Sequence, residues 1–189
     1  KEDFPIIEKD NAGIDIKINS NILFKLIDKT KFAISNEETR YFLNGLYFNV
    51  INEGNSNILT LVGTDGHRLA KFSHNIDTNI DKISGVIIPK KTIYELSKLL
   101  SEGDEDIEIS ISSNKIVFII GNVIFISKLI DGSFPDYKRV IPNDNNNVLK
   151  INRDILLSAV DRVSTIANEK SPVIKFKLLQ NLLNLNTIN

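Results

Sequence analysis

The stretch KINSNILFKLIDK, residues 17–29, returns later in the chain as KINRDILLSAVDR, residues 150–162. Both copies open with Lys-Ile-Asn, carry Ile-Leu at the same offset, and close with Asp and a basic residue. A weaker third copy, IPKKTIYELSKLL, spans residues 88–100. A repeat of this kind indicates a fold built from copies of one supersecondary unit.

Each copy has the pattern of a strand that leads into a helix. IDIKI (residues 14–18) alternates apolar and polar side chains, as a half-buried strand does. Asn19 or Ser20 can then cap the helix, whose apolar residues recur at helical spacing on one face. In the copy at 88–100, Pro89 ends the strand and fixes a backbone angle that suits the first turn of a helix.

The segments that follow the first two helices have the composition of strands. They are residues 40–51, 58–63 and 68–73 after the first helix, and 106–112, 115–120 and 123–129 after the second. Ser113-Asn114 and Gly121-Asn122 leave only two residues between the later strands, which is the spacing of hairpins. Residues 14–130 therefore predict two β-α-β-β-β units. This is an α+β fold in which two amphipathic helices pack on one face of antiparallel strands.

A change in composition follows these two units. DGSFPDYKRVIPNDNNN (residues 131–147) has three Asp, two Pro and a run of Asn, the composition of a loop or linker. A third unit begins at residue 148 with VLKIN and continues as a helix from Arg153 to about Ala167, followed by two strand-like segments. We expect this third unit to be incomplete, with one helix instead of two and an unpaired strand edge.

The bulk composition excludes several classes of protein. The chain has 189 residues, 42% of them hydrophobic, which suffices for a core, and its net charge is −1. It has no cysteine, so it forms neither disulfides nor a thiolate metal site. Lys or Asp interrupts every apolar segment and no signal peptide opens the chain. We expect a cytoplasmic protein with no membrane partner. The lack of Met and the start at Lys1 predict a fragment or a processed product.

The stretch TDGHRLA (residues 64–70) gathers an aspartate, a histidine and an arginine. Asp65-Gly66 between two strand-like segments is a hairpin signal, because glycine reaches positive φ. An enzyme hypothesis would make His67 a general base oriented by Asp65, but neighbours on a tight turn rarely point at one another. His67 and His74 lack metal-ligand spacing, and the chain has no phosphate-binding loop or nucleophile elbow. We expect no catalytic residue, no metal and no cofactor.

Positive charge is concentrated on the two predicted helices, each with three lysines against one acidic residue. These lysines are Lys25, Lys29 and Lys31 in the first helical region and Lys90, Lys91 and Lys98 in the second. An ordinary solvated lysine face is one interpretation. If both helices lie on one side of a sheet, that side instead forms a basic track that binds phosphates without reading bases.

Five motifs in the same order resemble one family, the bacterial DNA polymerase III beta subunits, or sliding clamps. They are TRYFLNG (39–45), TDGHRLA (64–70), VIIPKK (86–91), SKLIDGSFPDYKRVIP (127–142) and ANEK (167–170). The similarity runs from EDFP (2–5) to near the end of the chain. The resemblance implies the DNA clamp fold, in which a protomer has three similar domains, each of two β-α-β-β-β halves.

The resemblance also implies a non-catalytic role as a processivity factor. Two protomers of the family close head to tail into a homodimeric ring around double-stranded DNA, with helices lining the hole and sheets outside. By this similarity residues 1–145 are the middle domain and residues 146–189 begin the C-terminal domain. The implied partners are the DNA polymerase III catalytic subunit, the clamp loader, and other polymerases and repair proteins that carry a clamp-binding peptide.

In the family, the TDGHRLA turn helps to form the pocket that takes a peptide of the type Gln-Leu-x-Leu-Phe. The resemblance places the pocket here at Leu43, Thr64, Gly66, His67, Arg68, Leu69, Pro135, Arg139 and Val140. It implies DNA contacts at Lys25, Lys29, Arg40, Tyr41, Lys90 and Lys91, and a protomer interface at Thr165 and Ile166. Glu37-Glu38, just before Arg40, departs from a surface that would attract phosphate. Two alternatives remain: a small-ligand enzyme using His67 and Asp65, and a peptide-binding scaffold with no DNA role.

Overall fold

The computed structural model describes residues 14–53, 56–76, 83–101, 103–168 and 173–187. The chain divides into two compact units, Lys1–Asp136 and Tyr137–Asn189. The EDFP motif and the last two residues of ANEK lie outside the described residues. No helix in the described ranges combines the length and the apolar character needed to span a membrane.

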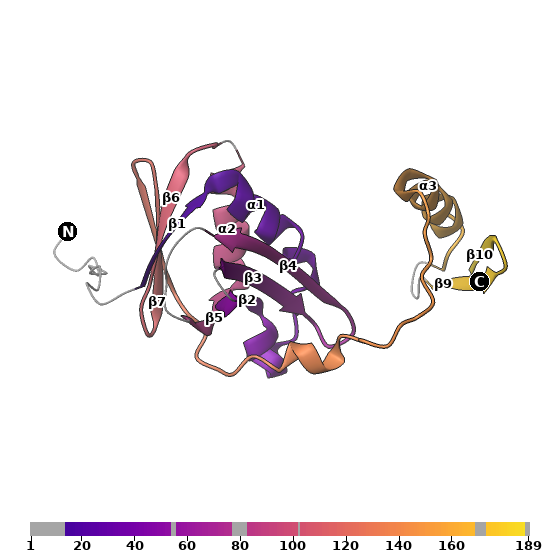
Figure 1. The fold of residues 1–189 in the computed structure, drawn as a ribbon, viewed down its shortest axis with the longest axis horizontal. Coiled ribbons are helices and arrows are strands. Elements are labelled where there is room, and N and C mark those ends of the chain that lie inside the picture. The colour runs from indigo at the N-terminus through magenta and orange to yellow at the C-terminus, as the bar shows by residue number, and fades with distance from the viewer. Residues whose placement is uncertain (1–13, 54–55, 77–82, 102, 169–172, 188–189) are drawn as a thin grey trace. The chain divides into compact units, whose positions relative to one another are not determined.

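The first unit contains two copies of a strand, a helix and three further strands (Figure 1). The first copy comprises β1 (Ile14–Asn19), α1 (Ser20–Asp28), β2 (Gly45–Glu53), β3 (Ser56–Thr64) and β4 (Leu69–Ile76). The second comprises β5 (Ile83–Pro89), α2 (Lys90–Leu100), β6 (Asp106–Ile111), β7 (Lys115–Ile120) and β8 (Val123–Lys128). The predicted duplication of β-α-β-β-β units is therefore present in the structure.

The two copies exchange their first strands. The strand order is β1-β6-β7-β8 in one antiparallel sheet and β4-β3-β2-β5 in the other. Each sheet thus holds three strands of one copy and the first strand of the other. A backbone bridge between Ile87 and Ile130 links the edges of the two sheets, with the Ile130 N–H donating to the Ile87 carbonyl at 2.9 Å.

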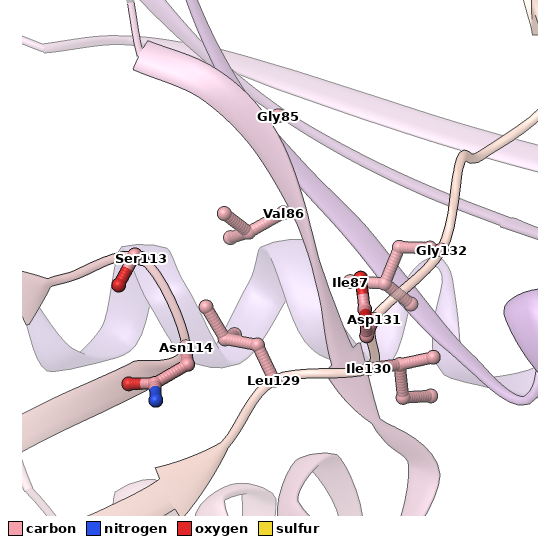
Figure 2. A pocket seen from close by; sticks show the side chains of 9 residues that line it. All are labelled: Gly85, Val86, Ile87, Ser113, Asn114, Leu129, Ile130, Asp131 and Gly132. Carbon is pink, nitrogen blue, oxygen red and sulfur yellow. The ribbon is translucent and has the colours of Figure 1, made fainter.

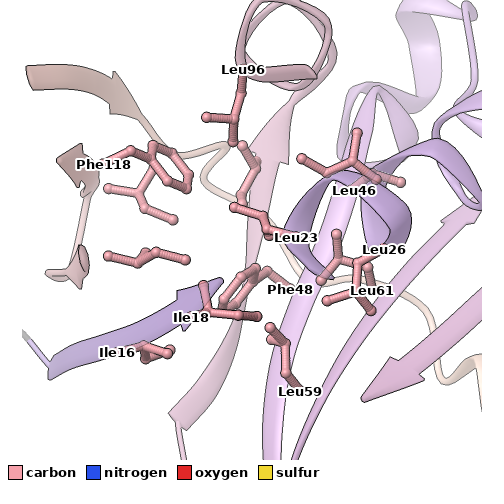
Figure 3. Close-up of a cluster of buried hydrophobic side chains, with 14 of the residues drawn as sticks. Ile16, Ile18, Leu23, Leu26, Leu46, Phe48, Leu59, Leu61, Leu96 and Phe118 are labelled. Carbon is pink, nitrogen blue, oxygen red and sulfur yellow. The ribbon is translucent and has the colours of Figure 1, made fainter. Parts of the chain in front are cut away.

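One hydrophobic core joins both sheets and both helices (Figure 3). Leu26 of α1, Leu96 of α2, Phe48 of β2 and Phe118 of β7 are all fully buried in it. The helices pack beside one another, and the Lys31 ammonium, three residues after α1, donates to the Ser97 hydroxyl of α2 at 3.0 Å. Burial of such side chains is worth about 1.5–3 kcal/mol each, so this shared core fixes the helices on the sheets.

The segment predicted as one strand over 40–51 differs from the structure at its start. Residues Glu38–Leu43 form two short 3-10 turns, together η2, that meet at a non-helical backbone position at Arg40, and the strand begins only at Gly45. The Asn44 N–H donates to the Tyr41 carbonyl at 3.0 Å, which closes the last helical turn. Gly45 then passes so close to β5 that an added Cβ would lie 2.2 Å from the Ile88 carbonyl oxygen. A side chain at that position would separate the strands.

The second unit holds one helix and one hairpin. A short 3-10 helix, η3 (Tyr137–Val140), precedes α3 (Arg153–Ser164), which is followed by the antiparallel strands β9 (Ile174–Leu179) and β10 (Leu182–Thr187). The Asn152 side chain accepts from the N–H groups of Asp154 and Ile155 at 2.9 and 3.1 Å and so caps α3. The helix α3 ends at Ser164, three residues before the predicted end near Ala167. The short helix η3 lies inside the segment 131–147 that was predicted as a linker.

Candidate functional site

The β3–β4 hairpin places the DGHR sequence (residues 65–68) on a four-residue loop. Thr64 and Leu69 are the last paired residues of the two strands. The Thr64 hydroxyl donates to the Arg68 carbonyl at 2.7 Å and accepts from the Gly66 N–H at 3.1 Å. Gly66 has a φ of +88°, which a glycine adopts without a steric penalty. The predicted hairpin is confirmed, and its positive φ falls on the predicted glycine.

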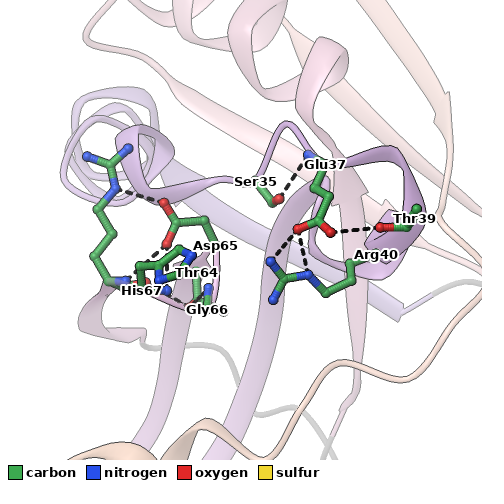
Figure 4. Close-up of polar contacts among 9 residues, drawn as sticks. Ser35, Glu37, Thr39, Arg40, Thr64, Asp65, Gly66 and His67 are labelled. Carbon is green, nitrogen blue, oxygen red and sulfur yellow. Dashed lines mark hydrogen bonds and ion pairs between the residues drawn. The ribbon is translucent and has the colours of Figure 1, made fainter. Parts of the chain in front are cut away.

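Asp65 organises the backbone of this loop (Figure 4). Its Oδ1 accepts from the backbone N–H groups of His67 and Arg68, both at 3.0 Å, and its Oδ2 accepts from the Arg68 Nε at 3.1 Å. These backbone hydrogen bonds hold the pKa of the Asp65 carboxyl below its ordinary value of 3.8. Both oxygens of the Asp65 carboxylate therefore accept hydrogen bonds within the turn. The carboxylate does not orient the His67 imidazole as the enzyme hypothesis requires.

Two arginines flank the loop. The Arg68 guanidinium lies over the Phe32 ring, 5.6 Å from its centroid, and Phe32 itself is 55% exposed. Arg40, on η2, approaches the loop from another segment. Its guanidinium is so near Gly66 that a Cβ placed on Gly66 would lie 2.6 Å from the Arg40 Nη1. The loop is thus bordered by an exposed aromatic ring and two cationic groups, a composition suited to a peptide with apolar and polar contacts.

Arg40 is held in this position by Glu37. The Arg40 Nε donates to the Glu37 Oε2 at 2.8 Å, and the Arg40 Nη2 pairs with the same oxygen. The Thr39 hydroxyl donates to the other carboxylate oxygen at 2.8 Å. The hydrogen bond from Arg40, reinforced by that from Thr39, lowers the pKa of the exposed Glu37 carboxyl from its ordinary 4.5.

The structure brings together some of the predicted pocket residues. Thr64, Gly66, His67, Arg68 and Leu69 share the hairpin, with His67 and Arg68 exposed and Leu69 half-buried at the start of β4. The other predicted members lie elsewhere in the chain: Leu43 is buried at the end of η2, Pro135 is exposed near the end of the first unit, and Arg139 and Val140 are exposed on η3 of the second unit.

Three of the predicted DNA-contacting lysines lie on the paired helices, and the fourth, Lys29, directly follows α1. Lys25, Lys29 and Lys91 are exposed; Lys29 lies 4.0 Å from the Asp28 carboxylate, and neither Lys25 nor Lys91 forms an ion pair within the described ranges. Lys90 is half-buried, donates to the Asn36 side chain, and places its ammonium 5.7 Å from the Tyr94 ring centroid. Three of these four lysines are therefore exposed to solvent.

The remaining predicted site residues have separate surroundings. Tyr41 is 54% exposed and packs edge-on against Phe42, while a Cβ on Gly132 would lie 3.4 Å from the Tyr41 ring. Thr165 and Ile166 follow the last turn of α3, where the Thr165 hydroxyl donates to the Asp161 carbonyl at 3.0 Å and Ile166 is 63% exposed.

A hollow of about 360 Å³ lies away from the hairpin (Figure 2). Its walls are residues 85–87 of β5, the β6–β7 turn at 113–114, and residues 129–132, with the Asp131 carboxylate as its one charged group. A second hollow of about 310 Å³ borders the start of α1 and includes Lys17, His74 and Asp106. No group of three or more metal-ligating side chains occurs within the part of the chain that the structure describes.

Sequence reasoning missed two residues that hold the loop. Phe32 supports Arg68, and Glu37 supports Arg40. The spacing of Glu37 and Arg40, three residues apart, could have indicated an ion pair, although 3-10 geometry at that segment was not predicted. The contact of Phe32 with Arg68 joins distant segments and has no local signal.

Two strand-exchanged β-α-β-β-β copies, with their helices paired on one core, define the class of DNA clamp domains. Family models match the chain over two regions: the central domain of the DNA polymerase III beta subunit covers residues 17–136, and its C-terminal domain covers residues 138–189. The chain belongs to the DNA polymerase III beta subunit family.

Individual relatives agree with this assignment. The beta sliding clamp of Caulobacter vibrioides is 47% identical over 173 residues, which are 92% of this chain and 46% of the relative. The DnaN sliding clamp of Bartonella birtlesii, solved bound to griselimycin, is 47% identical with a TM-score of 0.91 over 98% of this chain and 50% of that one. A Caulobacter crescentus beta sliding clamp superposes with a TM-score of 0.92 at 44% identity, over 97% of this chain and 49% of that one. The chain spans about half the length of the curated relatives that it matches.

Proposed function

We propose that this chain is part of a non-catalytic processivity factor that encircles duplex DNA and tethers a replicative polymerase to it. The observation that carries this proposal is the pairing of α1 and α2 on one shared core, with exposed Lys25 and Lys91 on those helices and exposed Lys29 directly after α1. Lysines attract phosphates as point charges without reading bases, which suits a protein that slides along any sequence. The tether is topological, so it requires no active site.

The proposed DNA face comprises five of the six residues that the family resemblance indicates. They are Lys25 on α1, Lys29 directly after α1, Lys90 and Lys91 on α2, and Tyr41 on η2. The sixth, Arg40, is paired with the Glu37 carboxylate. In the proposed ring, each phosphate contact contributes weakly and exchanges rapidly, because the lysines are solvated and salt screens their charge. Low affinity per contact is compatible with sliding.

The test of the proposed function is retention on circular DNA. A full-length family protein that carries this chain is loaded onto nicked plasmid and passed over a sizing column before and after linearisation. A ring stays with the circular DNA at salt that removes surface-bound protein, and leaves when the DNA gains free ends. Equal retention on circular and linear DNA would refute encirclement. Loss from both at that salt would refute it as well.

We propose that the Thr64–Leu69 hairpin captures the clamp-binding peptides of partner proteins. Within the first unit, Leu69 and Pro135 supply apolar surface, and Arg68 supplies donors for peptide carbonyls or a carboxylate. Thr64, Gly66 and His67 complete the proposed pocket. Burial of one Leu and one Phe of the peptide contributes about 1.5–3 kcal/mol each. After the cost of association, this suits exchangeable binding with a Kd on the order of micromolar.

The proposed partners are those of the family: the DNA polymerase III catalytic subunit, the clamp loader, and other polymerases and repair proteins that carry such peptides. We propose residues 1–145 as the middle domain and 146–189 as the start of the C-terminal domain of a cytoplasmic bacterial clamp. Thr165 and Ile166 are proposed to meet a second protomer. The exposed Ile166 side chain supports a contact at this position.

A further inference from the structure

Arg40 and Gly66 come together from segments that are far apart in the sequence. The guanidinium of Arg40 borders Gly66 so closely that a Cβ at Gly66 would lie 2.6 Å from Nη1, with the next two guanidinium atoms at 3.6 and 3.8 Å. All three nearest neighbours of that position belong to Arg40. The planar cation therefore occupies the space that a side chain at Gly66 would fill.

Glu37 fixes the guanidinium against the loop. It accepts from both Nε and Nη2 of Arg40, which leaves Nη1 as the nitrogen nearest to Gly66. Arginine's rigid fork makes such a pair directional, whereas a lysine would offer only a point charge on a flexible stem. The orientation of Arg40 thus depends on the Glu37 carboxylate.

Glu37 is itself tied to the core. Its backbone N–H donates to the Ser35 hydroxyl at 3.1 Å, and the buried Ser35 donates its own N–H to the Leu43 carbonyl at 3.2 Å. The Thr39 hydroxyl holds the second carboxylate oxygen at 2.8 Å. A short series of contacts therefore runs from buried Leu43 through Ser35 and Glu37 to Arg40, and Figure 4 shows its part from Ser35 to Arg40.

We propose that Glu37 and Arg40 are positioning residues of the peptide site, which press a guanidinium against Gly66 and so fix the backbone that presents His67, Arg68 and Leu69. This inference rests on the proposed peptide-binding function of the hairpin. It assigns Arg40 to the peptide side rather than to DNA, because the Glu37 carboxylate neutralises its charge. The same neutralisation does not apply to Lys25 or Lys91.

The experiment compares Glu37→Gln with Glu38→Gln and Arg40→Lys. The two glutamate variants remove the same charge from neighbouring exposed positions, but only Glu37 contacts Arg40. Arg40→Lys keeps the charge and removes the fork. Capture of a labelled Gln-Leu-x-Leu-Phe peptide is measured by fluorescence polarisation on the full-length clamp. The backbone amide resonance of Gly66 is recorded by NMR on this 189-residue chain, with thermal unfolding as a check that all variants fold alike.

We expect peptide capture about two- to fivefold weaker in both Glu37→Gln and Arg40→Lys, with Glu38→Gln unchanged. The Gly66 amide should move in the first two variants and stay in the third, and DNA affinity should be equal in the two glutamate variants. The proposal is overturned if Glu37→Gln behaves like Glu38→Gln, or if Arg40→Lys retains full capture. If the unaltered clamp does not bind the peptide, the proposed function fails, and the Gly66 resonance alone decides whether Arg40 holds the loop.

Discussion

Ile18 of β1 lies opposite Ile107 of β6 in the antiparallel register, and both side chains are buried. The first residue belongs to one copy of the repeat and the second to the other. This pairing means that neither copy completes its sheet alone, because each depends on the first strand of its neighbour. The first unit is therefore expected to fold as one cooperative body, with its two helices fixed by both sheets.

Replacing Ile107 with Ala should destabilise both copies together. The side chain is fully buried, so its truncation leaves a cavity and costs about 2–5 kcal/mol. Urea unfolding followed by circular dichroism should show an earlier transition of unchanged slope. Ile124→Ala, at a position on β8 that is 66% exposed, is the control and should cost far less. Two separate transitions for the first unit would contradict the shared core.

Replacing Gly66 with Ala should disturb the loop. A φ of +88° costs an alanine about 1–2 kcal/mol, and the added Cβ displaces the Arg40 guanidinium. Gly103→Ala is a matched control, because its Cβ would meet only the Ser20 side chain, no closer than 3.5 Å. The melting temperature and the affinity for the peptide should both fall for Gly66→Ala. Both should stay unchanged for Gly103→Ala. Equal thermal stability and equal peptide affinity of the two variants would contradict the requirement for a positive φ at Gly66.

The Asp65 carboxylate should make the hairpin acid-sensitive. Its pKa is lower in the folded chain than in the unfolded chain, so the unfolded state binds more protons in the acid range. The stabilisation is complete above the ordinary value of 3.8 and is lost as the pH falls through the lower, folded pKa. Asp65→Asn should therefore flatten the acid limb of the stability profile measured by urea unfolding. An acid limb that is unchanged in this variant would show that Asp65 does not contribute.

Neutralising helix lysines should weaken DNA binding uniformly across sequences. Lys25→Gln and Lys91→Gln are each expected to reduce the slope of log affinity against log salt by about 1 in the full-length clamp, as the loss of one phosphate contact does. Lys71→Gln, an exposed lysine on β4, is the charge-matched control. A slope that falls equally in all three variants would indicate a bulk charge effect instead of a helix-lined DNA face.

Local chemistry predicted much of this structure. Asn19, one of the two cap residues that the sequence offered, accepts from the Asn21 N–H at 3.0 Å and caps α1. Gly66 carries the predicted positive φ. These features depend on a few neighbouring residues, so they can be predicted from local sequence patterns.

Long-range pairing was not predictable in the same way. The periodicity that marked the strands does not say that β1 joins β6 and β5 joins β2, because both arrangements bury the same alternating side chains. The segment of η2 was misread as part of a strand because RYFLNG contains two aromatic residues, which favour strands. The DNA contact of Arg40 was predicted from the family resemblance and stays a prediction, whereas its hydrogen bond to Glu37 and its proximity to Gly66 appear only in three dimensions.

The most direct test of the account measures peptide capture by the hairpin. Leu69→Asp places a charge at the half-buried start of β4, and Leu99→Asp makes the same change at a position on α2 that is 41% exposed. Fluorescence polarisation of a labelled Gln-Leu-x-Leu-Phe peptide on the full-length clamp should show loss of binding for Leu69→Asp and a normal Kd for Leu99→Asp. Unchanged affinity of the Leu69 variant would contradict the assignment of this hairpin as the partner-binding site.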